Sequence, residues 1–314
     1  MSNESAYKVK IVVAFVAIFA FFLTAATAQA QPSSSDAYRT ESFSVSGDTD
    51  LEVQTSGGSI QVYGTERGEV RVEMYVRKRG KYVDPGEADL DEWDISINKQ
   101  GSKVYAVAER KGNRRWGRNS YSISFAVYAP RNTETDLRTS GGSIRLESLA
   151  GTQIARTSGG SMRAENIDGD LNLRTSGGTI RIADIQGNIE AKTSGGSIDV
   201  GKAIGDVTAH TSGGSITIEG VSGNLSARTS GGSIRAYFDE LGDEIDLSTS
   251  GGSIRVTVPK GAGLDVDLRG NRVNTELQNF SGSSKRRSLE GSLNGGGTSL
   301  RARTSGGSVT LNYN

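Results

Sequence analysis

The chain contains no cysteine, one histidine and only four prolines in 314 residues, and aromatic residues make up 6% of it. Without cysteine there can be no disulfide and no thiolate metal site, so packing and backbone hydrogen bonds must hold the fold. Basic and acidic side chains number 36 each, which gives a formal net charge of zero. A balanced charge argues against nucleic-acid binding, because that function needs a strongly basic surface.

Long apolar runs are also missing, apart from Ile11 to Leu23 near the N-terminus. Lys8 and Lys10 precede this run, and Ala28-Gln29-Ala30 follows it with the small-x-small pattern of a signal peptidase site. We therefore expect cleavage before Gln31 and an exported protein, in the periplasm or at the cell surface. The alternative is a retained anchor, because the run approaches the roughly 18 residues that a membrane span needs. In that case the membrane would be contacted through this segment alone.

Glycine, by contrast, is abundant at 42 residues, and most of it belongs to a repeat. The motif Thr-Ser-Gly-Gly-(Ser/Thr)-(Ile/Met/Val) begins at Thr55, Thr139, Thr157, Thr175, Thr193, Thr211, Thr229, Thr249 and Thr304. From Thr139 to Thr229 the motif recurs at a constant 18-residue spacing, five times in succession, and the next step, to Thr249, is slightly longer. Such regularity is typical of a solenoid, in which each repeat stacks on its neighbours.

Within each repeat, alternating apolar residues flank the glycines, which predicts a strand before the bend and another after it. Leu171 and Leu173 precede the motif at Thr175, and Ile180 and Ile182 follow it. The equivalent positions are apolar in every repeat from Thr175 to Thr249, so stacking would bury them in columns. One repeat alone could not fold, because its few aliphatic side chains cannot offset the entropy of ordering the whole repeat. We predict an all-β, single-stranded β-solenoid of about 18-residue rungs, with the threonine column inside it forming hydrogen bonds between rungs.

The two long gaps between motifs, from Thr55 to Thr139 and from Thr249 to Thr304, predict longer irregular rungs at both ends, which would cap the exposed edges. Residues 51–63 fit the pattern of a first rung, and alternating stretches after them fit degenerate rungs, with a loop or short helix over 84–93. Residues 280–287 are expected to form a polar loop. The expected segments are a signal peptide (1–30), a flexible linker (31–40), N-terminal capping rungs (41–131), a regular solenoid (132–260) and C-terminal irregular rungs with a cap (261–314).

The turns themselves resemble a known family. The stretch Val127-Tyr128-Ala129-Pro130, the motif at Thr139 and the later Leu293-Asn294-Gly295-Gly296-Gly297 are similar to bacterial β-strand-repeat proteins that carry the name "putative adhesin". The resemblance covers nearly all of residues 41–314. It implies the fold and an adhesin-like role, but no catalytic or binding residue comes with it.

Residues for catalysis or metal binding are scarce. The lone His210 lies in an outward column among arginines, with no nucleophile or carboxylate placed beside it by the pattern. Glu147 and Glu165 would stack in adjacent rungs, as a glycosidase pair could, but their column continues with Ala183 and Gly201. The Gly-Gly-x-Gly-x-Asp repeat of calcium-binding solenoids is absent. We expect no catalytic residue, no metal and no cofactor.

The most distinctive surface feature is a pair of basic columns that flank the Ser-Gly-Gly bend. The first column consists of Arg138, Arg156, Arg174, Lys192, His210 and Arg228. The second column consists of Arg145, Arg163, Arg181, Asp199, Thr217, Arg235 and Arg255. Such columns could bind phosphate, sulfate or uronate groups. Alternatively they are a solvated surface neutralised by Asp136, Glu147, Glu165 and Glu190. The basic loop over 110–118 presents the same two alternatives.

These observations leave three hypotheses for function. The first is a non-enzymatic, adhesin-like or structural envelope protein that binds an anionic envelope polysaccharide or a surface protein along the basic columns. The second is a carbohydrate-active enzyme on the same scaffold, because polysaccharide lyases and hydrolases also use parallel β-helices. The third is a periplasmic regulatory partner in envelope stress.

Overall fold

The computed structural model describes residues 36–112 and 121–314. The expected signal peptide and most of the basic loop lie outside these residues. Every element in the described part is a β-strand, from β1 to β27, and most pairings are parallel. Within the same residues, no helix is long and apolar enough to cross a membrane.

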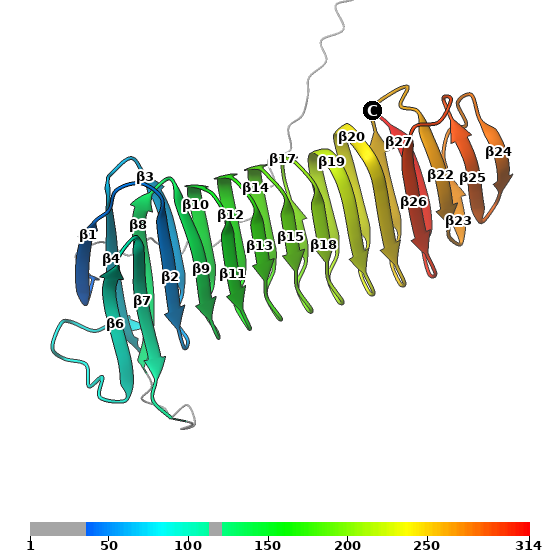
Figure 1. The fold of residues 1–314 in the computed structure, drawn as a ribbon. Helices are drawn as coiled ribbons and strands as arrows, with labels where there is room; N and C mark the ends of the chain where they lie inside the picture. Colours follow the sequence, from blue (N-terminus) through cyan, green and yellow to red (C-terminus); the bar gives the residue numbers. More distant parts are fainter. Residues whose placement is uncertain (1–35, 113–120) are drawn as a thin grey trace, which may run out of the picture. The chain divides into compact units, whose positions relative to one another are not determined.

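Each repeat contributes two strands, one on either side of its Ser-Gly-Gly bend, and these strands form two ladders. Strands of the first ladder end at or just before the motif threonine: β9 (Thr133–Thr139), β11 (Gln153–Thr157), β13 (Leu171–Arg174), β15 (Ile189–Lys192), β18 (Val207–His210) and the second halves of β19 (Ile216–Thr229) and β20 (Ile234–Thr249). Strands of the second ladder follow the bend: β10 (Ile144–Ala150), β12 (Met162–Asp168), β14 (Ile180–Gln186), β16 (Ile198–Val200), β17 (Ala203–Ile204), the first halves of β19 and β20, and β21 (Ile254–Val258). Figure 1 shows β9, β11, β13, β15 and β18 side by side in one row.

Both ladders are parallel and in phase with the repeat. Leu171 pairs with Ile189 in the first ladder, and Ile180 pairs with Ile198 in the second, and each pair joins equivalent positions of successive repeats. Like positions therefore superpose in adjacent rungs, as the motif spacing predicts. The result is a mostly parallel, β-solenoid-like all-β fold.

The core lies between the two ladders. The predicted inward columns are buried in full; Leu173, Ile180 and Ile198, for example, are 0% exposed. Inward residues of both ladders belong to one continuous buried cluster. Because both ladders face this shared core, their outward side chains lie on opposite sides of it.

The motif threonines are buried and link successive rungs, as predicted. The Thr175 hydroxyl donates to the Gly160 carbonyl of the preceding rung at 2.9 Å and accepts the Gly178 amide of its own bend at 3.3 Å. The same donation to a glycine carbonyl of the adjacent rung recurs at Thr139, Thr157, Thr193, Thr211, Thr229, Thr249 and Thr304. A buried polar side chain is tolerated here because its hydroxyl is satisfied in both directions.

The two glycines of the bend differ in how closely the rungs approach them. A Cβ on Gly178 would lie closer than 3.0 Å to backbone atoms of Gly160 and Ser161, whereas the nearest atom to a Cβ on Gly177 is 3.5 Å away. The second glycine is therefore required by the stacking distance itself.

At the N-terminal end, the order of rungs in space differs from their order in the sequence. The rung of β2 (Thr49–Thr55) and β3 (Ile60–Thr65) stacks directly on β9 and β10, although the two motif threonines, Thr55 and Thr139, lie far apart in the sequence. On its other side lie β7 (Lys103–Arg110) and β8 (Tyr121–Pro130), which form an outer rung without a motif. The prediction that residues 51–63 form a rung is confirmed, but this rung is first only in the sequence, because β7 and β8 lie outside it in the stack.

The remaining N-terminal strands are not parallel rungs, so that part of the prediction is wrong. The strands β4 (Glu69–Lys78) and β6 (Trp93–Gln100) run antiparallel to β8 and β7. Short strands β1 (Arg39–Ser44) and β5 (Lys81–Tyr82) pair antiparallel with β4. Residues 83–92 form a loop, one of the two forms expected there. These antiparallel strands end the stack, because β4 covers the edge of β8 and β6 covers the edge of β7.

At the C-terminal end, too, the order of the rungs in the stack differs from their order in the sequence. The last strands, β26 (Thr298–Thr304) and β27 (Ser308–Tyr313), lie between the rung of β20 and β21 and the rung of β22 (Leu264–Arg269) and β23 (Arg272–Asn274). Then β25 (Ser288–Leu293) and β24 (Ser281–Lys285) close the first ladder as antiparallel strands. The polar loop expected over 280–287 is thus mostly strand. As a consequence, all nine motif rungs, from Thr55 to Thr304, stack without interruption.

Candidate functional surface

The two basic columns expected from the sequence exist, but they lie in different ladders. In the first column, Arg156 pairs with Arg174 in register, and in the second, Arg163 pairs with Arg181. Outward side chains of the two ladders lie on opposite sides of the core. The columns therefore flank the bend, as the sequence predicts, on two different faces, and they do not form one continuous arginine surface.

Acidic side chains on the same strand or on an adjacent rung neutralise much of the first column. Arg138 pairs with Asp136 at 2.6 Å and Arg174 with Glu190 at 3.0 Å, and each carboxylate also binds a second basic residue of the column. Hydrogen bonds from Lys192 and Arg174 hold the pKa of Glu190 below its usual range. Further along, Arg228 pairs with Asp246 at 2.6 Å.

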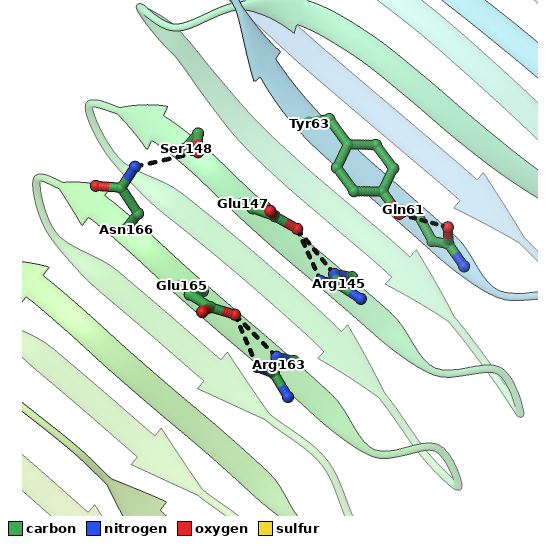
Figure 2. A network of polar contacts seen from close by, with 8 residues as sticks. All are labelled: Gln61, Tyr63, Arg145, Glu147, Ser148, Arg163, Glu165 and Asn166. Atoms are coloured by element: carbon green, nitrogen blue, oxygen red, sulfur yellow. Dashed lines mark hydrogen bonds and ion pairs between the residues drawn. The ribbon is translucent and has the colours of Figure 1, made fainter. Parts of the chain in front are cut away.

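The second column is neutralised in its N-terminal half. Figure 2 shows Arg145 and Arg163 each reaching along its own strand to a glutamate, Glu147 and Glu165, at 2.8 Å. Arg181 lies 3.8 Å from Asp199, whose pKa is raised because burial disfavours its charge. These pairs match the solvated, neutralised surface that the sequence offered as an alternative. Exposed pairs of this kind contribute only about 0–1 kcal/mol each, so a ligand anion could replace a carboxylate at little cost.

The C-terminal half of the second column is different. Arg235 and Arg255 are neighbours in register, and in the described part of the chain neither guanidinium has a carboxylate within ion-pair distance. They line a groove of about 320 Å³. The polar residues that complete the groove are Ser233, Ser253, Asn274, Ser308 and Thr310.

The remaining candidate residues lie on the same outward faces as the arginines. Glu147 and Glu165 do stack in register, but each is engaged by the arginine of its own strand. His210 is exposed in its column between Lys192 and Arg228. In the described ranges, no cluster of three or more histidine or carboxylate side chains could hold a metal ion. Of the basic loop, residues 113–118 lie outside the described residues, and Arg110 pairs with Glu92 at 3.1 Å.

Sequence reasoning missed one further column, at the second turn of each rung. Asp170 Oδ1 accepts the Asn188 amide at 3.0 Å, and Asn188 Oδ1 accepts the Asp206 amide at 3.2 Å. Asp206 Oδ1 in turn accepts the Asn224 amide at 3.1 Å. The 18-residue spacing of these four residues was the signal that could have revealed the column. Its role is to satisfy backbone donors where the chain turns.

Taken together, the fold and its surface define an all-β, mostly parallel repeat protein whose outward columns carry charge. Residues 171–312 match the model of the family described as Toastrack DUF4097, so the resemblance expected from the Ser-Gly-Gly turns is confirmed over this stretch. No curated protein matches the chain.

The chain is also similar to solved structures of bacterial proteins. A putative adhesin from Parabacteroides distasonis is 13% identical, with 87% of this chain and 96% of that chain covered and a TM-score of 0.49. A putative adhesin from Parabacteroides merdae is 12% identical, with 87% and 95% covered and a TM-score of 0.45.

Proposed function

We propose that this protein is an exported, non-enzymatic component of the cell envelope that binds an elongated anionic polymer along its outward columns. The supporting observation is the uninterrupted register of the nine motif rungs. Because rungs rise by about 4.8 Å, like side chains recur along the protein at a constant short spacing. A linear partner can therefore make the same contact several times, which multiplies weak individual contacts into useful affinity.

The charge pattern favours an anionic partner over a neutral one. Basic residues outnumber their acidic partners in the first column, since Asp136 and Glu190 are each shared by two cations. The arginine side chains are accessible; that of Arg156 is 42% exposed and that of Arg181 is 63% exposed. Guanidinium groups suit phosphate, sulfate and carboxylate groups because they donate two parallel hydrogen bonds.

Binding of uronate-, phosphate- and sulfate-bearing polymers to the full-length protein tests this function. Affinity should fall at least about tenfold between about 0.1 and 1 M salt, over which the screening length drops from about 10 to about 3 Å. Since the columns lie on opposite sides, they are tested separately, with the double variant Arg156→Ser/Arg174→Ser for one side and Arg163→Ser/Arg181→Ser for the other. At least one of these two double variants should bind the polymer more weakly than the wild type does.

The matched control removes two exposed arginines outside both columns, Arg39→Ser and Arg67→Ser, and should bind as the wild type does. Polymer binding that persists at high salt, or that neither column variant weakens, would refute the proposal. The appearance of new reducing ends or unsaturated products in the same mixtures would instead indicate a carbohydrate-active enzyme.

A further inference from the structure

The second column changes character where it reaches the last rungs. In its N-terminal half, each arginine has a carboxylate on its own strand or on the next rung. In the two rungs of Arg235 and Arg255, the positions two residues later hold Tyr237 and Thr257 instead. Two adjacent guanidinium groups are thus left without an acidic partner in the part of the chain that the structure describes.

The groove beside these arginines is rich in hydrogen-bond donors. Ser233 Oγ accepts the Ser253 amide and Ser253 Oγ accepts the Ser308 amide, each at 3.2 Å. Each hydroxyl oxygen accepts a backbone hydrogen bond, and its own hydrogen is available to donate to a ligand. Thr310 and the amide of Asn274 add further donors to the lining, and no carboxylate among the described residues contributes to it.

From this arrangement we infer that the groove of Arg235 and Arg255 is a specific binding site for a phosphate or sulfate ester group. Stacked in register, the two arginines rise by about 4.8 Å, so that one tetrahedral group can lie between them. Its three terminal oxygens can accept from both guanidiniums and a serine hydroxyl at once, whereas a carboxylate offers only two oxygens. The groove volume of about 320 Å³ leaves room for part of the alcohol or sugar that carries the ester.

This inference rests on the proposed function, because it names the anionic group that the bound polymer would present. The same ester chemistry occurs in soluble polymers and in lipid headgroups. Two arms of the experiment separate these sources: a phosphate- or sulfate-bearing polysaccharide in solution, and vesicles that contain phosphatidylglycerol.

The direct test titrates inorganic phosphate and sulfate into the full-length protein and follows the NMR signals of the arginine side-chain Nε–H groups. The signals of Arg235 and Arg255 should shift on titration. The double variant Arg235→Ser/Arg255→Ser should bind at least about tenfold more weakly, since each lost charged hydrogen bond is worth about that factor. The matched control, Arg39→Ser/Arg67→Ser, removes the same charge from exposed arginines outside both columns and should bind as the wild type does.

Both double variants replace exposed side chains, and equal unfolding temperatures would show that their folds are intact. The inference is overturned if neither ion shifts the two signals, if the Arg235/Arg255 variant keeps wild-type affinity, or if the control loses affinity equally. Ion binding at these arginines without any polymer binding would support the site and refute the proposed function. Polymer binding that is unchanged in the Arg235→Ser/Arg255→Ser variant would support the proposed function and refute the site.

Discussion

Replacing Gly178 with alanine adds one methyl group at the point where two rungs come closest. The new Cβ would overlap the carbonyl carbon and oxygen of Gly160 and the amide nitrogen of Ser161. All three are backbone atoms, so no side chain can rotate away to make room. The two rungs must therefore separate locally, and the hydrogen bond from Thr175 to the Gly160 carbonyl lies at the same place.

The cost can be worked out from these contacts. Overpacking by a methylene or methyl group costs about 1–3 kcal/mol, and a weakened buried hydrogen bond adds about 1 kcal/mol. We expect Gly178→Ala to lower the free energy of unfolding by about 2–4 kcal/mol. For a chain of this size that corresponds to a fall of about 4–8 °C in the unfolding temperature.

Gly177→Ala is the matched control, because it adds the same atom one residue earlier. Its nearest neighbour is 3.5 Å away, an ordinary van der Waals distance, and its backbone does not adopt the left-handed conformation that favours glycine. Alanine also restricts the unfolded chain, which stabilises a protein by about 0.4–1 kcal/mol at a compatible site. Gly177→Ala should thus be neutral or slightly stabilising.

Thermal and urea unfolding, followed by circular dichroism, measures both variants. Amide hydrogen exchange adds a local test, since protection should be lost first in the rungs next to residue 178. Equal stability of the two variants, or a Gly178→Ala protein as stable as the wild type, would refute the close stacking on which the argument depends.

Three further predictions concern single side chains. Thr175→Val should lower the free energy of unfolding by about 1–3 kcal/mol in urea titrations, because two buried backbone groups lose their partner. Thr175→Ser keeps the hydroxyl and loses only a buried methyl group, so it should cost no more than about 1 kcal/mol. Burial raises the pKa of Asp199, so the folded state disfavours the charged carboxylate and loses stability as the pH rises above the ordinary value of 3.8. The Asp199→Asn variant should therefore unfold at a higher temperature than the wild type at pH 7, but not at pH 3. Lys192 and Arg174 lower the pKa of Glu190, so the charged Glu190 side chain stabilises the fold above about pH 4.5 and this stabilisation is lost on acidification. The difference in stability between the wild type and the Glu190→Gln variant should therefore vanish at low pH.

Much of the solenoid-like stack could be predicted because every repeat carries the same constraint. The constant spacing of the motif fixes the register, and alternation around the bend decides which residues face inward, as Leu173 and Ile180 do. Buried threonine in a regular strand pattern also predicts a hydrogen-bond column. The absence of an acid two residues after Arg235 and Arg255 was visible in the sequence too, although its meaning required the register.

Only the tertiary structure decided the ends of the stack and the placement of the charges. Nothing in the local pattern of β7 or β8 shows that the Thr55 rung lies between them and the Thr139 rung, because strand pairing there depends on contacts far apart in the sequence. The antiparallel pairing of β24, β25 and β4 is decided in the same way. Local sequence determined which face of each strand is buried; the shared core determined that the two basic columns point in opposite directions.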